Sequence, residues 1–132
     1  EAGILFIGLP SGRRIAYVKP EIGENRFGGK SITYMGMDQT SKKWTRLETW
    51  GGKLVENIVQ AFARDCLAES IMKLDKAGYR VVFHVHDEVI LDEPKDRSSA
   101  QEVAALMGQP IEWAPGLPLN ADAYECEYYR KD

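Results

Sequence analysis

The segment that decides the fold covers residues 81–91 and reads Val81-Val82-Phe83-His84-Val85-His86-Asp87-Glu88-Val89-Ile90-Leu91. Two apolar runs rich in β-branched residues flank a His-Asp-Glu triplet. Such runs are typical of strands, and a short polar break between them is typical of a hairpin turn. The segment therefore predicts two carboxylates and an imidazole at the tip of a β-turn-β unit. A carboxylate held on a rigid hairpin is a good ligand for a hard cation such as Mg²⁺.

Length and composition indicate one ordinary domain or a piece of a larger protein. The chain has 132 residues and an apolar content of 44%, enough for a core. It begins Glu1-Ala2-Gly3-Ile4, with neither an initiator Met nor a signal peptide, and we expect it to be cut from a longer chain. No stretch approaches the roughly 20 apolar residues of a membrane span. Two cysteines, Cys66 and Cys126, are too few for a disulfide framework and favour a reducing, cytoplasmic location.

The net charge of −3 is unevenly distributed along the sequence. Residues 1–53 carry nine basic and five acidic side chains, whereas residues 54–132 carry eight basic and fifteen acidic ones. A basic half beside an acidic half is compatible with one surface that faces phosphates and another that faces a metal. Ordinary variation of surface charge accounts for the pattern equally well.

Hairpins dominate the predicted elements. The pattern predicts hairpins over 4–18 and 31–49, a loop over 20–30, one long helix closed by Gly78, and the hairpin over 80–91. A shorter helix over 97–107, N-capped by Asp96, and a final strand over 119–128 complete the chain. This order predicts an α+β fold, an antiparallel sheet built from hairpins with one long and one shorter helix packed on it. Residues 1–50, 51–78 and 79–132 would be three segments of a single fragment.

The long helix has two chemically different faces. Successive helical residues turn by about 100°, which places five apolar side chains in one arc of roughly 100° and four hydrogen-bond donors in an opposite arc of roughly 60°. The apolar stripe, expected to face the core, comprises Val55, Ile58, Val59, Phe62 and Cys66. The donor face comprises Lys53, Asn57, Gln60 and Arg64. Amide and basic side chains together suit phosphate, sugar and base edges, although a solvated helix face is the simpler interpretation.

Two motifs in this order resemble the C-terminal palm of family A DNA polymerases, in their phage-like branch. Val85-His86-Asp87-Glu88 is similar to the family's motif C, which reads V-H-D-E between two apolar strands. Asn57-Ile58-Val59-Gln60-Ala61 is similar to the preceding helix, where the family places a Gln that faces the primer–template. Residues 9–13, 47–54 and 119–122 also resemble the phage-type branch, so that the resemblance covers nearly the whole chain.

The resemblance implies template-directed DNA synthesis. In this reaction the primer 3′-hydroxyl attacks the α-phosphate of a deoxynucleotide, while two Mg²⁺ ions clamp the attacking and leaving oxygens. Asp87 would be the motif C metal ligand, Glu88 would tune the site or contact a metal through water, and His86 would contact the primer end. These three are the candidate catalytic residues. The candidate DNA-binding residues are Gln60, Arg64, Lys53, Asn57 and His86.

The resemblance also implies parts that these residues lack. In the family, the motif A Asp and the fingers helix that binds the nucleotide lie upstream, and neither has a counterpart in residues 1–132. We therefore expect the isolated chain to hold Mg²⁺ poorly and to be inactive. The implied partners are a DNA primer–template and deoxynucleotide triphosphates, in a parent enzyme of phage or prophage origin that acts away from membranes. Surfaces meant for the fingers, thumb and motif A regions predict that the fragment self-associates.

Two alternatives remain open at this point. His84 and His86 form an H-x-H pair, and on a strand residues i and i+2 share a face, so both imidazoles could meet one zinc in a small metal-dependent hydrolase. The second alternative is a non-catalytic nucleic-acid-binding or interaction module in which the acidic hairpin is purely structural.

Overall fold

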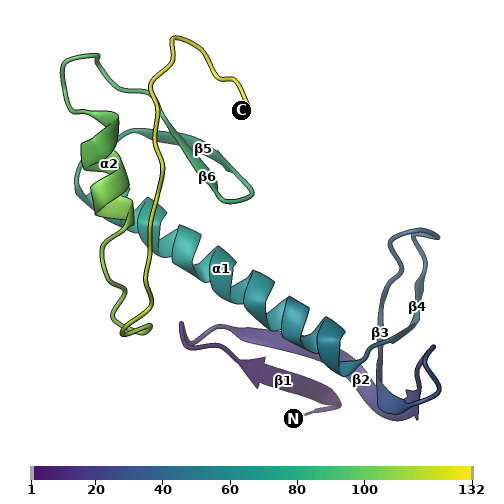
Figure 1. The fold of residues 1–132 in the computed structure, drawn as a ribbon. Coiled ribbons are helices and arrows are strands. Elements are labelled where there is room, and N and C mark those ends of the chain that lie inside the picture. The colour runs from purple at the N-terminus through teal and green to yellow at the C-terminus, as the bar shows by residue number, and fades with distance from the viewer. Residues whose placement is uncertain (1, 132) are drawn as a thin grey trace. The chain divides into compact units, whose positions relative to one another are not determined.

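A computed structural model of the chain describes residues 2–131. Over these residues the chain forms six strands and two helices, so the predicted α+β class is confirmed (Figure 1). The elements in chain order are β1 (Ile4–Gly8), β2 (Arg14–Glu24), β3 (Lys30–Met37), β4 (Trp44–Glu48), α1 (Gly51–Lys76), β5 (Val81–Val85), β6 (Glu88–Leu91) and α2 (Ala100–Met107). Strands β1–β4 form one antiparallel sheet in chain order, and β5 and β6 form a second.

The chain divides into two compact units, Glu1–Phe62 and Ala63–Asp132. The boundary falls inside α1 rather than at either of its ends. Neither helix is both long and apolar enough to cross a bilayer, as judged over the described residues.

In the first unit, strand β2 is longer than the sequence predicts. The loop expected from residue 20 begins only after Glu24, because residues 21–24 still pair with β3. Pro20 is tolerated inside this strand because the register shifts between Val18 and Glu21, where no ladder hydrogen bond needs its missing N–H. The turn that follows is closed by Asn25, whose carboxamide oxygen accepts hydrogen bonds from the N–H groups of Phe27 and Gly29 at 2.9 and 3.3 Å.

Tyr17 anchors the sheet of the first unit to the first half of α1. Its side chain is only 2% exposed, and its ring meets Tyr34 edge to face with centroids 4.9 Å apart. Its hydroxyl accepts a hydrogen bond from the Asn57 amide at 3.0 Å. The Arg13 guanidinium adds a second link, because it donates to the Ala61 carbonyl at 2.8 Å.

The apolar stripe predicted for α1 is only partly buried, since Ile58, Phe62 and Cys66 are half-buried. Val55 and Val59, by contrast, are 58% and 57% exposed. The buried residues of the helix lie in its second half and are Asp65, Leu67, Ser70 and Leu74.

The predicted C-terminal cap of α1 is confirmed. Gly78 adopts a φ of +84°, a left-handed conformation that favours glycine. Its N–H donates to the Asp75 carbonyl at 2.8 Å, and the Tyr79 N–H donates to the Leu74 carbonyl at 3.0 Å. This pair of bonds is a Schellman motif, which ends the helix and directs the chain into β5.

The predicted start of the second helix is wrong by three residues. Helix α2 begins at Ala100, and its N-cap is Ser99 rather than Asp96. The Ser99 hydroxyl accepts from the Glu102 N–H at 3.3 Å, while the Glu102 carboxylate accepts from the Ser99 N–H at 3.2 Å. This reciprocal pair is a capping box and satisfies two backbone donors at once, whereas Asp96 lies in the preceding turn.

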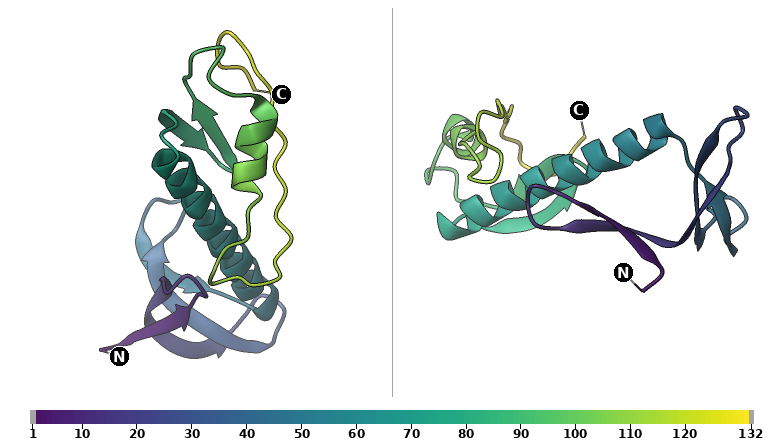
Figure 2. Two further views of the ribbon diagram at one scale, coloured as in Figure 1. Left: turned by 90° about the vertical axis from the view of Figure 1, so that its left-hand side faces the viewer. Right: turned by 90° about the horizontal axis from the view of Figure 1, so that it is seen from below.

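The final strand predicted over 119–128 does not form, since these residues join neither sheet. The segment instead runs back beside α2, as Figure 2 shows, and is attached through side chains. The Glu125 carboxylate accepts from the Ala100 N–H at 3.2 Å, and Glu127 pairs with Lys95 at 3.3 Å. A pattern of alternating apolar and polar residues does not form a strand when no neighbouring strand is available to pair with its backbone.

Candidate functional site

The hairpin of β5 and β6 carries the His-Asp-Glu triplet as predicted. Val85 pairs with Glu88 and His84 with Val89, so that His86 and Asp87 form a two-residue turn. His86 has a φ of +51°, a left-handed conformation that His adopts more readily than β-branched residues do. The paired strands β5 and β6, which are rich in β-branched residues, therefore fix the backbone on both sides of the turn.

Asp87 is exposed at this turn. Its carboxylate makes no hydrogen bond or ion pair with any residue that the structure describes. Glu88 is half-buried at the start of β6, and its backbone pairs with Val85. The turn thus presents one unpaired carboxylate to solvent with a second, less exposed carboxylate next to it in sequence.

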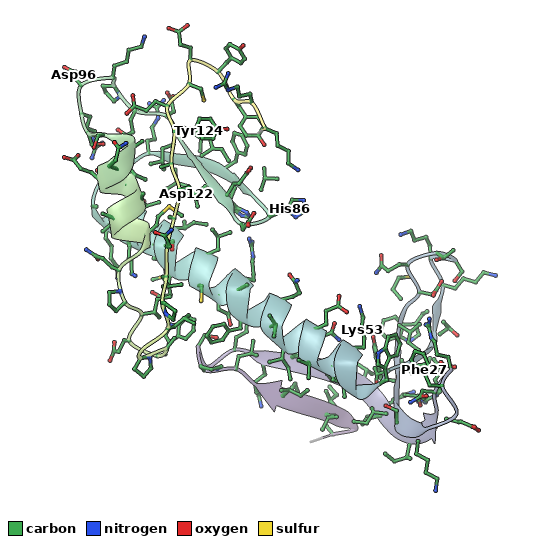
Figure 3. All side chains as sticks on the ribbon, viewed as in Figure 1. Phe27, Lys53, His86, Asp96, Asp122 and Tyr124 are labelled. Carbon is green, nitrogen blue, oxygen red and sulfur yellow. The ribbon has the colours of Figure 1, made fainter. Side chains whose placement is uncertain are left out.

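The two histidines do not lie on one strand face. Figure 3 shows His86 at the tip of the hairpin, directed away from the strands. His84 lies inside β5, where the Arg64 guanidinium approaches both ring nitrogens, at 3.2 Å to Nδ1 and 3.4 Å to Nε2. The shared face that a zinc-binding H-x-H pair requires is therefore not formed, and a cation already lies beside His84. His84 is thus a hydrogen-bonded residue of a strand.

The donor side chains of α1 have different surroundings. Lys53, in the first turn of the helix (Figure 3), pairs with Glu56 at 3.0 Å. Asn57 is bound to Tyr17, Gln60 is exposed, and Arg64 contacts His84. Gln60 is therefore the donor of this face that is most available to a ligand. Sequence reasoning did not find Tyr17 as the partner of Asn57, because the two lie 40 residues apart.

The carboxylates of the hairpin are the kind of ligand that a magnesium ion binds, but there are too few of them to form a complete site. Oxygen ligands are those that Mg²⁺ prefers, and a turn can hold them rigidly. Among residues 2–131, however, no group of three or more His, Cys, Asp or Glu side chains is placed to hold a metal ion. Asp87 and Glu88 can therefore contribute ligands to a metal site but do not complete one.

The cysteines of the chain are free. Burial raises the pKa of the Cys66 thiol, and the nearby Asp65 carboxylate raises it further. Because the thiolate is the nucleophilic form, these surroundings make Cys66 a poor nucleophile near neutral pH.

The chain is similar over its whole length to a segment of DNA polymerases. It is 58% identical over 133 aligned positions to the DNA polymerase of Bacillus phage SP02, and it spans 20% of that relative. It is also 28% identical to the thermostable DNA polymerase I of Thermus thermophilus, over 86% of this chain and 13% of the relative. The resemblance to family A DNA polymerases of phage type is thereby confirmed. No protein-family model matches the chain, and no solved structure does.

Proposed function

We propose that this chain is a palm segment of a DNA-directed DNA polymerase and supplies its motif C. The observation that carries the proposal is the 58% identity to a phage DNA polymerase across the whole chain. The structure is consistent with it, since the V-H-D-E residues lie at a hairpin turn and Asp87 is exposed there. The parent enzyme would act on a primer–template and deoxynucleotide triphosphates in the cytoplasm of the host, where two free cysteines would stay reduced.

Within this function Asp87 is a metal ligand, and Glu88 supports it. Mg²⁺, when bound, supplies Lewis-acid stabilisation of the charge that develops on the reacting phosphate oxygens. Asp87 contributes an unpaired carboxylate on a backbone fixed by β5 and β6, whereas the half-buried Glu88 tunes the charge of the turn. The remaining carboxylate comes from motif A of the parent enzyme, so that the isolated chain is inactive.

The DNA contacts of this segment come from the turn and from α1. His86 projects from the hairpin tip (Figure 3) and contacts the primer end. Gln60 donates to minor-groove acceptors, which occupy similar places in every base pair, so that it checks pair shape without reading sequence. Lys53 and Asn57 add contacts to the sugar–phosphate backbone when DNA is bound, whereas Arg64, the other basic candidate on this face, already lies beside His84.

Large apolar side chains on the described surface support the view that this is a segment of a larger enzyme. The most exposed are Ile22, Phe27, Trp44, Val55, Val59 and Tyr128. We infer that the fingers, thumb and motif A regions cover such side chains in the parent enzyme. The isolated chain would then self-associate through them at high concentration.

A chimeric enzyme tests the proposed function. We expect that the DNA polymerase of Bacillus phage SP02 still extends a primer when this chain replaces its matching segment, because more than half of the aligned residues are identical. Primer extension on a DNA template is the measurement, and the unmodified phage enzyme is the reference. The isolated chain, assayed in parallel, should add no nucleotides. A folded chimera that binds DNA but extends no primer would contradict the proposal.

The Gln60→Ala variant tests the DNA-facing role of α1. We expect it to weaken primer–template affinity of the chimera by about tenfold, the size of one well-formed contact to base edges. Folding should be unaffected because Gln60 is exposed. Titration of the chimera with a fluorescent primer–template measures the affinity. Gln101→Ala, which removes an exposed Gln from α2, is the matched control and should leave the affinity unchanged.

A further inference from the structure

Arg64 and His84 form a contact that joins α1 to the hairpin within the second unit. The guanidinium nitrogens of Arg64 lie 3.2 Å from Nδ1 and 3.4 Å from Nε2 of His84. His84 belongs to β5 and precedes Asp87 by three residues. The contact therefore lies on the stem of the hairpin, directly below the turn that carries the exposed carboxylate.

The chemistry of the two groups fixes what this contact requires. A guanidinium has five N–H donors and no acceptor, so that His84 must accept through a ring lone pair. A neutral imidazole has one such nitrogen, and an imidazolium has none. The contact therefore consists of one hydrogen bond and a second close approach along the planar guanidinium. A lysine ammonium is a point charge and cannot match both nitrogens.

The hairpin needs such an anchor because its sheet is small. Among the described strands, β5 pairs only with β6. A two-stranded ribbon is at best marginally stable by itself, so side-chain contacts decide where it lies. The Phe83 ring meets Tyr129 with centroids 5.1 Å apart, but both side chains are more than 40% exposed. Among the described residues, the contact of Arg64 with His84 links this stem to the long helix.

The position of Asp87 depends on this stem. Its carboxylate has no partner among the described residues, so its place is set by the backbone of the turn. The pair Val85–Glu88 closes that turn immediately after His84. A hairpin that shifts on α1 would therefore move Asp87 with it, and a metal ligand must be held within a fraction of an ångström to act.

We propose that Arg64 is a positioning residue for motif C, which acts through His84 to hold Asp87 in place, and that this role outweighs any contact of Arg64 with DNA. The inference rests on the proposed function for its consequence in catalysis. The anchoring itself is a property of the second unit and can be measured without catalysis.

The experiment uses the chimera and compares Arg64→Ala, His84→Ala, the double variant and Lys76→Ala. Lys76 is an exposed cation on the same helix that contacts no other described side chain, so its loss controls for charge alone. Hydrogen–deuterium exchange of residues 81–91 is measured first, without metal or DNA. We expect Arg64→Ala and His84→Ala each to speed exchange by about fivefold, the effect of one net hydrogen bond. The double variant should exchange no faster than either single variant, because both lose the same contact.

Two further readouts separate positioning from DNA binding. Without divalent ions, Arg64→Ala should change primer–template affinity by less than about twofold and leave its salt dependence intact. Loss of a phosphate contact would instead reduce the slope of log affinity against log salt concentration by about one. Primer extension by this variant should need about fivefold more Mg²⁺ for half-maximal rate, and Arg64→Lys should recover only part of the loss. Unchanged exchange in Arg64→Ala, or a reduced salt slope together with unchanged Mg²⁺ dependence, would overturn the proposal. If the unmodified chimera extends no primer, the proposed function fails, while the exchange data still decide whether Arg64 anchors the hairpin.

Discussion

Replacing Asp87 with alanine is expected to reduce nucleotide addition by the chimera by about a thousandfold, the upper range for removing one group that stabilises transition-state charge. The physical reason is that the turn would lose its unpaired carboxylate, and the remaining Glu88 is less exposed and belongs to β6. Single-turnover primer extension at saturating DNA and nucleotide measures the effect on the chemical step directly.

The same variant should fold and bind DNA normally. Asp87 is exposed and contacts no described side chain, so its removal breaks no packing or hydrogen bond. Primer–template affinity without divalent ions should stay within about twofold, because the carboxylate repels rather than attracts phosphates. Asp96→Ala removes another exposed carboxylate from a turn, labelled in Figure 3, and is the matched control. Extension by Asp87→Ala at the rate of this control would remove Asp87 from the proposed mechanism.

Elements set by local chemistry could be predicted from the sequence. The hairpin at 81–91 follows from β-branched runs on both sides of a polar turn, and the end of α1 follows from Gly78, which adopts the left-handed conformation of a helix cap. The start of α2 was missed although its signal was present. Ser99-Ala100-Gln101-Glu102 has the S-x-x-E spacing of a capping box, and the competing Asp96 lacks a Glu or Gln three residues later.

Features that depend on distant partners could not be predicted. The bound state of Asn57 requires Tyr17, and the contact of Arg64 requires His84, but nothing local in the sequence pairs these residues. The buried face of α1 was predicted only in part, for a related reason. Periodicity identifies an apolar face, whereas burial depends on which neighbours reach the helix, and Val55 and Val59 remain exposed. The candidate site was thus located by its motif, and its supporting contacts came only from the structure.

Leu74→Ala is expected to destabilise the second unit by about 2–5 kcal/mol, the range measured when a large core side chain is truncated. Leu74 is fully buried, at 0% exposure, and among the described residues of this unit only Leu67, Ile111 and Ala114 join it as buried apolar residues. A core this small has few other contacts to compensate for a cavity. Leu74 also sits at the C-terminal end of α1, where its carbonyl accepts from the Tyr79 N–H at 3.0 Å as the chain turns toward β5.

Urea unfolding of the 132-residue chain, followed by circular dichroism, measures this loss as a lower transition midpoint. Met72→Ala is the matched control, since Met72 lies on the same helix, is 50% exposed and has a helix propensity close to that of Leu. Its cost should be below about 1 kcal/mol, because little apolar surface returns to water. Because the turn that ends α1 leads into β5 within a few residues, the loss of Leu74 should also speed hydrogen exchange in the hairpin that carries Asp87. Equal urea midpoints for the two variants would show that Leu74 does not contribute to a core of the second unit. The stability of the hairpin would then not depend on the burial of Leu74.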